Sequence, residues 1–182
     1  MSDDRSSSLR LITAPSSEPL TLAQAKTFLR IEHSADDEPL TRAIASARQA
    51  LEQHIRSALL PQVWEYSIAN PPSNKVPLPL GPAQNITSVA LTTEAGVTST
   101  MSASNYRLSV DGFSVLFSTA TNSEKMTVRY SASIASSVAE IPLPLVQGML
   151  HHISVMMETR DGAVPLPMQA IACYEPFRRI SL

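Results

Sequence analysis

The sequence predicts an α+β protein: a helical bundle with an inserted small antiparallel β-sheet lobe and an extended C-terminal tail. Three observations predict this class. Apolar residues recur at helical spacing over 18–60, alternate with polar residues from Gln62 onward, and return to helical spacing after Ile141. Because helical segments stand on both sides of the alternating segment, we expect the strands to be an insertion into a single folding unit.

The expected domain organisation follows from these changes of period. Residues 1–17 are polar and rich in serine, and we expect them to form a flexible or docking N-terminal arm. The helical bundle is expected over 18–60 and 141–173, and the inserted β lobe over 61–140. Residues 174–182 are then left as a C-terminal docking tail.

Two amphipathic helices are predicted before the strands. Thr21 and Gln24 have the spacing of a capping box, so the first helix is expected to start there. The second should begin near the acidic run 36–38, with Ser34 or one of the aspartates as its cap, and continue until Pro61 stops it. Its expected inward face consists of Leu40, Ile44, Ala47, Leu51, Ile55 and Ala58.

The alternating segment predicts a set of short strands. Trp64 and Tyr66 lie in the first of them, where apolar and polar residues alternate as in a half-buried strand. In "KVPLPLGP" the prolines cannot donate to a sheet ladder, which limits this segment to a sheet edge or an extended strap. The Asp-Gly of "VDGF" predicts a hairpin turn. Further strands are expected over 86–92, 106–110, 113–117 and 126–130.

Helical spacing returns in "IPLPLVQGMLHHISVMMETRDG", and Asp161-Gly162 is expected to end this helix. A proline-bearing loop, "AVPLPMQ", then leads to the short segment "AIACYEPF". The expected inward stripe of the helix is Val146, Met149, Ile153, and Met156 or Met157.

Composition and charge exclude several classes of protein. The 16 acidic and 14 basic side chains give a net charge of -2, so no overall field attracts the protein to nucleic acid or an anionic membrane. No apolar run approaches the roughly 20 residues that cross a bilayer. One cysteine cannot form an internal disulfide, and "MSDDRSSSLR" does not resemble a signal peptide. We therefore expect folding in a reducing cytoplasm.

The sequence offers no candidate catalytic residue, cofactor site or metal site. His151 and His152 are adjacent and point about 100° apart on a helix, so an ordinary polar or interface role is favoured over metal binding. Cys173 lacks a local group that would activate it as a nucleophile, and a buried apolar role is favoured. Glycine-rich phosphate loops and nucleophile elbows are absent from the sequence. A non-enzymatic protein without cofactors is expected.

The last residues, "YEPFRRISL", contain the residue types that carry binding energy at protein interfaces. Tyr174, Phe177, Arg178 and Arg179 are such residues. Two interpretations have equal weight: a docking segment for a partner, or a last helical turn in which Tyr174 and Phe177 pack onto the bundle. As a docking segment, "RRISL" could also add a strand to a partner's sheet edge.

The order of motifs along the chain resembles the head-tail connector, or adaptor, proteins of long-tailed bacteriophages and related gene transfer agents. The motifs that carry the resemblance are "EPLTLAQAKTFLRI", "DDEPLTRAIASARQALE", "LLPQVWEYSI", "VPLPLGPAQNITSV", "NYRL", "MTVRYSA", "IPLPL" and "YEPFRR". The chain departs from the family in two places: it has "SASIASS" where a Gly-Tyr element often follows the "VRY" strand, and methionine where the last long helix often has an aromatic residue.

The resemblance implies a structural role in the neck of a virion or gene transfer agent particle, assembled in the bacterial cytoplasm. Copies would form a ring, expected to contain twelve subunits, between the portal protein of a DNA-filled capsid and the stopper or tail-terminator protein. DNA would pass through the channel without sequence-specific binding, and no membrane is involved. The C-terminal segment would reach the portal, which makes the candidate docking residues Tyr174, Pro176, Phe177, Arg178, Arg179 and Ile180.

Two alternatives remain open at this point. The chain could be another neck component, a stopper or tail-completion protein, that binds at a different level of the same assembly. It could also be a small enzyme or ligand-binding domain whose site is assembled from residues distant in the sequence.

Overall fold

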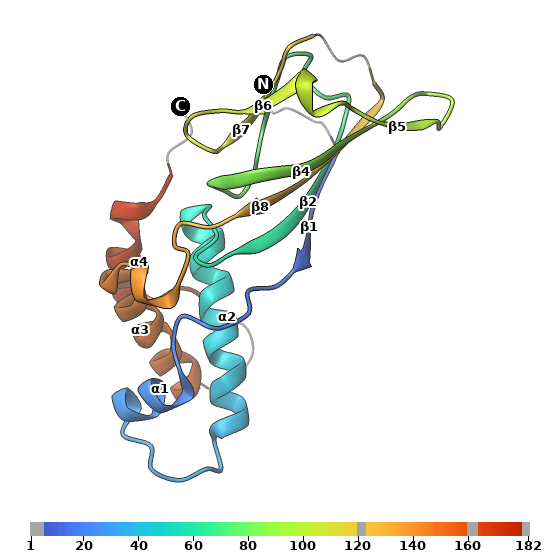
Figure 1. Ribbon diagram of the computed structural model, residues 1–182. Helices are drawn as coiled ribbons and strands as arrows, with labels where there is room; N and C mark the ends of the chain where they lie inside the picture. The colour runs from blue at the N-terminus through green and yellow to red at the C-terminus, as the bar shows by residue number, and fades with distance from the viewer. Residues whose placement is uncertain (1–5, 120–122, 160–163, 180–182) are drawn as a thin grey trace. The chain divides into compact units, whose positions relative to one another are not determined.

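The computed structural model describes residues 6–119, 123–159 and 164–179 of the chain (Figure 1). Two compact units are present, and each is built from two stretches of sequence. A β unit comprises Met1–Pro15 and Pro61–Ile134, and a helical unit comprises Ser16–Leu60 and Ala135–Leu182. The described residues contain four α-helices and two antiparallel sheets, which confirms the predicted α+β class.

The β unit consists of a five-stranded and a three-stranded sheet. Its strands are β1 (Ser7–Thr13), β2 (Gln62–Ala69), β3 (Lys75–Pro77), β4 (Ala83–Thr92), β5 (Thr98–Thr100), β6 (Tyr106–Leu108), β7 (Ser114–Phe117) and β8 (Lys125–Ala132). The larger sheet has the order β1-β2-β8-β4-β5, and the smaller has the order β3-β7-β6. All neighbouring strands are antiparallel.

Apolar and polar residues alternate along β2 and β8, so one face of each of these strands is buried. Tyr66 and Ile68 of β2 are buried, as are Val128 and Tyr130 of β8. The Tyr130 hydroxyl donates a hydrogen bond of 2.9 Å to the carbonyl of Leu80, so the largest side chain of this core leaves no unpaired polar atom.

Several predicted features of the β unit are confirmed. β3 lies at the edge of the smaller sheet, where Pro77 removes no ladder bond from a central strand. Gly112 has φ +72° in the turn between β6 and β7, as the Asp-Gly hairpin signal predicts. The strands expected over 86–92, 106–110, 113–117 and 126–130 are β4, β6, β7 and β8.

Two strands were not predicted. We expected a flexible or docking arm over 1–17, but Ser7–Thr13 forms β1 and pairs along β2, as the blue strand in Figure 1 shows. β5 is a short strand of exposed Thr and Ser residues paired with the end of β4. β5 carries no apolar alternation and owes its conformation to its partner strand, whereas in β1 the alternation is limited to Leu9 and Leu11 within a polar, serine-rich segment.

The helical unit contains α1 (Leu22–Leu29), α2 (Asp37–Ile55), α3 (Leu143–Thr159) and α4 (Met168–Tyr174), with 3₁₀ turns η2 (Val138–Glu140) and η3 (Glu175–Phe177). A further 3₁₀ turn, η1 (Ala103–Asn105), precedes β6 in the β unit. The segment around η2, which the sequence analysis assigned to the β lobe, belongs to the helical unit. No helix among the described residues is both long and apolar enough to cross a membrane.

Apolar stripes on α2, α3 and α4 form the core of the helical unit. The fully buried members are Leu40, Ala47 and Leu51 of α2, Leu145, Met149 and Ile153 of α3, and Ala170 and Tyr174 of α4. Met149 and Ile153 are buried as the stripe predicts, whereas Val146, Met156 and Met157 are only partly buried at its margin. The predicted end of α3 at Asp161-Gly162 lies outside the described residues.

The predicted helix ends are confirmed at α1 and need correction at α2. At α1 the Gln24 N–H donates to Thr21 Oγ1 at 3.2 Å, and the Thr21 N–H donates to Gln24 Oε1 at 2.9 Å. Asp36 is the N-cap of α2, but its backbone is in a turn conformation and its side chain accepts no capping bond. α2 also ends earlier than Pro61, because Arg56 adopts the left-handed conformation with φ 56°.

A buried charge cluster joins α2 to the rest of the helical unit. Arg48 Nε donates to Glu18 Oε2 at 2.7 Å, and Arg48 Nη1 donates to Glu52 Oε2 at 2.8 Å. The second oxygen of Glu52 accepts the Leu59 N–H at 2.9 Å, and the Leu59 carbonyl accepts the Ala135 N–H at 3.1 Å. The cluster around Arg48 therefore connects the three stretches at the borders of the unit, which are marked by Glu18, Leu59 and Ala135.

The electrostatics of Arg48 follow from this environment. Burial acts to lower the pKa of Arg48, but hydrogen bonds and charge from Glu18 and Glu52 outweigh it, so the pKa is raised above its usual value. The guanidinium is therefore charged and compensated by two carboxylates.

We predict that Arg48→Met lowers the free energy of unfolding by about 3–5 kcal/mol, because it leaves the buried Glu52 carboxylate without its cation. Arg42→Met is the matched control, since Arg42 pairs with Glu38 at the same i,i+4 spacing but its side chain is 65% exposed rather than 4%. The control should cost about 0.5 kcal/mol or less. Urea denaturation measures both values, and equal losses would contradict the importance of the cluster.

Candidate interface at the C-terminal end of the helical unit

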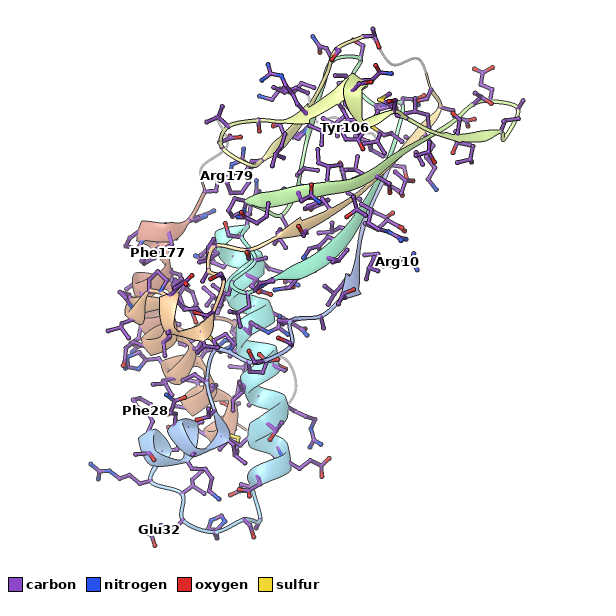
Figure 2. All side chains as sticks on the ribbon, in the orientation of Figure 1. Arg10, Phe28, Glu32, Tyr106, Phe177 and Arg179 are labelled. Atoms are coloured by element: carbon purple, nitrogen blue, oxygen red, sulfur yellow. The ribbon has the colours of Figure 1, made fainter. Side chains whose placement is uncertain are left out.

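The residues that the sequence singled out for docking lie at the end of the helical unit. α4 continues into the 3₁₀ turn η3, where Pro176 stands early enough in the turn to need no N–H partner. The chain then becomes extended at Arg178. Figure 2 labels Phe177 and Arg179 along this segment.

Tyr174 is the buried anchor of the segment. Its side chain is fully buried in the helical core, directly against Gly148 of α3. A Cβ atom at position 148 would lie 2.2 Å from Tyr174 Cε1, so only glycine leaves room for this ring. α4 can therefore approach α3 closely at this point.

His54, at the end of α2, lies beside the same ring. The two ring centroids are 6.0 Å apart, and His54 Nε2 lies 3.3 Å from Glu175 Oε1, an ion pair when the imidazole is protonated. Burial raises the pKa of Tyr174, so the phenol is neutral throughout the physiological range.

Beyond Tyr174 the segment is held by its backbone, and its side chains are exposed or half-buried. The Arg178 N–H donates to the Glu175 carbonyl at 3.1 Å, and the Arg179 N–H donates to the carbonyl of Ile55, the last residue of α2, at 3.3 Å. Phe177 packs against the core with part of its ring exposed. Arg178 is exposed and forms a surface ion pair of 3.3 Å with Glu175.

The structure separates the predicted docking residues into two groups. Tyr174 packs into the core, which was one of the two interpretations of the sequence. Pro176 and Arg178 are exposed, and Phe177 and Arg179 are half-buried. Ile180 lies outside the described residues.

Gly148 is the residue that sequence reasoning missed. An isolated glycine inside a helical pattern often marks a close approach of another element, and this signal was available in "LVQGML". The sequence did not reveal which side chain fills the space.

The other candidate residues serve packing and surface contacts. His152 is buried with Nε2 3.4 Å from the Val164 carbonyl, and burial lowers its pKa. His151 lies beside Gln147, with 3.1 Å between the two Nε2 atoms. Cys173 is half-buried against the helical core. Within the described part of the chain, no three His, Cys, Asp or Glu side chains are placed to hold a metal ion.

The comparison with protein families identifies the chain. The sequence model of phage gp6-like head-tail connector proteins matches residues 19–115, which is more than half of the 182 residues. The chain belongs to this family. The match extends from the start of α1 into β7, so it includes parts of both units of this connector.

Solved structures show the same fold over almost the whole connector. A chain from the neck of an empty gene transfer agent (GTA) particle, computed with C6 symmetry, has a TM-score of 0.79 and 22% identity, over 96% of this chain and 97% of that one. A chain from the virion of a native GTA particle has a TM-score of 0.73 and 23% identity, over 96% of each chain.

A third chain, from the neck of a native GTA particle computed with C12 symmetry, has a TM-score of 0.66 and 22% identity, over 96% of this chain and 97% of that one. No curated protein sequence matches the connector.

We predict that Gly148→Ala destabilises the connector by about 1–3 kcal/mol, because the new methyl group overlaps the Tyr174 ring. The sign of this change in the free energy of unfolding is informative, since a glycine-to-alanine substitution in an exposed helix stabilises by about 1 kcal/mol. A double-mutant cycle with Tyr174→Leu, which removes the overlapping atoms, should give a coupling of at least about 1 kcal/mol. If denaturant titrations show that the two substitutions lower the free energy of unfolding additively, the overlap with the Tyr174 ring is not the cause of the destabilisation.

Proposed function

We propose that this connector forms a ring in the neck of a phage or gene transfer agent particle, between the portal of a DNA-filled capsid and the stopper or tail. The observation that carries this proposal is the likeness of 96% of the chain to chains from GTA necks, in a member of the head-tail connector family. Assembly in the bacterial cytoplasm and a purely structural, non-enzymatic role belong to the same proposal.

Rotational symmetry favours a subunit with two different contact surfaces. In a cyclic ring each subunit contacts its neighbours through different faces. A chain with a helical bundle and an inserted β lobe can provide such faces from separate units. The ring is proposed to contain twelve copies, in line with the C12 symmetry used for one of the similar necks.

The C-terminal segment is the proposed portal-docking surface. The proposed portal contacts are made by Pro176, Phe177, Arg178, Arg179 and Ile180. Tyr174 anchors this segment in the core of the helical unit. Arg178 can exchange its exposed partner Glu175 for a portal carboxylate at little cost, because surface ion pairs contribute only about 0–1 kcal/mol. Because the helical unit already holds the segment, docking orders fewer residues than docking of a free tail would, and the entropy cost of binding is smaller.

The near-neutral charge suits passage of DNA through the ring. A strongly basic channel would bind phosphates and release counterions, which retains DNA. The net charge of -2 on 182 residues gives no such overall attraction. DNA would therefore pass without sequence-specific binding.

The direct test of the neck function is a particle that lacks this connector. We expect DNA-filled capsids and complete tails that do not join, as seen by electron microscopy, with joining restored by the wild-type chain supplied in trans. Normal joining without the connector would overturn the proposal.

Portal docking is tested separately with Arg178→Glu. We predict that affinity for purified portal rings falls at least about tenfold, because interfaces concentrate binding energy in such arginines. Arg42→Glu is the control for charge reversal at an exposed arginine of the same unit, and it should bind as the wild type does. Unchanged binding by Arg178→Glu, and also by Phe177→Ala, would favour a stopper or tail-completion role, which uses other contacts.

A further inference from the structure

The edge strands of the β unit differ in how they are protected against pairing with another chain. β3 and β6 are the edges of the smaller sheet. β3 carries the exposed Lys75 and Pro77, and β6 carries the exposed Arg107. Charges and prolines at such positions oppose the addition of a further strand. The larger sheet ends in β1, which has one charged residue and no proline, and in β5, which has neither.

β1 presents a regular row of outward backbone groups. The Ala69 N–H donates to the Ser6 carbonyl at 2.9 Å, so the backbone of every second residue from Ser6 faces β2. The N–H and C=O groups of Ser7, Leu9 and Leu11 therefore point away from the sheet, and the bulge of β1 comes only after Leu11.

The side chain of Arg10, the one charged residue of β1, is 68% exposed but is paired with a residue of the neighbouring strand β2. Arg10 donates to Glu65 Oε1 at 2.8 Å, and Arg129 of β8 donates to Glu65 Oε2 at 2.7 Å. The two cations lower the pKa of Glu65, with the Arg129 hydrogen bond as the largest cause, so the carboxylate stays charged and Arg10 keeps its partner. Arg10 is therefore paired within the sheet.

A row of apolar side chains that crosses the larger sheet also ends at β1. Leu9 lies opposite Tyr66, which lies opposite Val128, which lies opposite Val89. The last three side chains are buried, whereas Leu9 is 38% exposed. A further strand beside β1 would cover Leu9 and extend the row.

β5 is the unprotected edge at the other end of the same sheet. The Thr93 N–H donates to the Val97 carbonyl at 3.1 Å and the Met101 N–H donates to the Val89 carbonyl at 2.8 Å, so the backbone of Thr98 and Thr100 faces outward. β5 contains only Thr and Ser, with neither charge nor proline.

We propose that β1 of one connector pairs with β5 of the next copy, so that the larger sheet continues from subunit to subunit around the ring. This inference rests on the proposed ring. A cyclic ring requires two different patches on each subunit, and two unprotected edges at opposite ends of one sheet are such patches. Pairing of β1 with β1 would instead close a two-fold dimer and leave β5 uncovered.

The strand directions agree with a ring. Four antiparallel steps separate β1 from β5, so the two edges run in the same direction. Rotation about a ring axis by a small angle keeps that direction, so β1 and the neighbour's β5 pair in parallel. β5 has 3 residues, so the edge contact sets the register of neighbours and adds to other contacts in the ring.

Disulfide cross-linking tests the pairing in the full chain, with Cys173 replaced by Ser. Leu9→Cys and Ser99→Cys place thiols on the same face of the sheet, at its two edges. Within one copy β2, β8 and β4 separate them by roughly 19 Å, far beyond the roughly 7 Å limit for Cα atoms in a disulfide. Oxidation of assembled particles should therefore give a reducible ladder of multimers extending beyond the dimer.

Matched variants make the result specific. The pair Lys75→Cys and Arg107→Cys on the protected edges should give no ladder, and neither Leu9→Cys nor Ser99→Cys alone should give more than monomer. Rings seen by electron microscopy without the ladder would overturn the edge pairing and leave the neck function intact, as would dimers from Leu9→Cys alone. Particles whose necks contain no ring of this chain would overturn both.

Discussion

The helical unit depends on the charge cluster around Arg48. Apolar packing between helices tolerates small shifts, but a guanidinium between two carboxylates fixes direction, because each N–H must meet an oxygen. Removal of these charges from water is costly, and the cost is offset only if all partners are in place. Glu18, Glu52 and the backbone of Leu59 meet this condition. The stretches that border the unit are thereby held in one arrangement.

The same principle of a fixed support under an exposed surface applies to the C-terminal segment. Tyr174 fills the space that Gly148 leaves, and the Arg179 N–H bonds to the last carbonyl of α2. Phe177 and Arg178 therefore stand on a support that is complete before any partner binds. The interface side chains are few, but their position is set by the core of the unit.

Local chemistry made much of the fold predictable. The Thr21 capping box, the proline of β3 and the Asp-Gly turn specify conformation within a few residues. β1 was missed because its conformation depends on a distant partner, as in the pairing of Leu9 with Tyr66, and β5 because its Thr and Ser residues carry no apolar alternation. The end of α2 at Arg56 was missed because a left-handed arginine has no sequence signature. The aromatic-arginine tail was recognised, but its division into a buried anchor and exposed side chains required the position of α4.

The discontinuous make-up of both units has a consequence for synthesis. β1 leaves the ribosome long before its partner β2, and the apolar faces of α1 and α2 are uncovered until α3 and α4 have been translated. The β unit can therefore close only after Ile134 has been translated, and a product cut short before Tyr174 keeps an open helical core. Chains that expose an unfinished apolar core are prone to aggregation and proteolysis, so the last helix protects the whole helical unit.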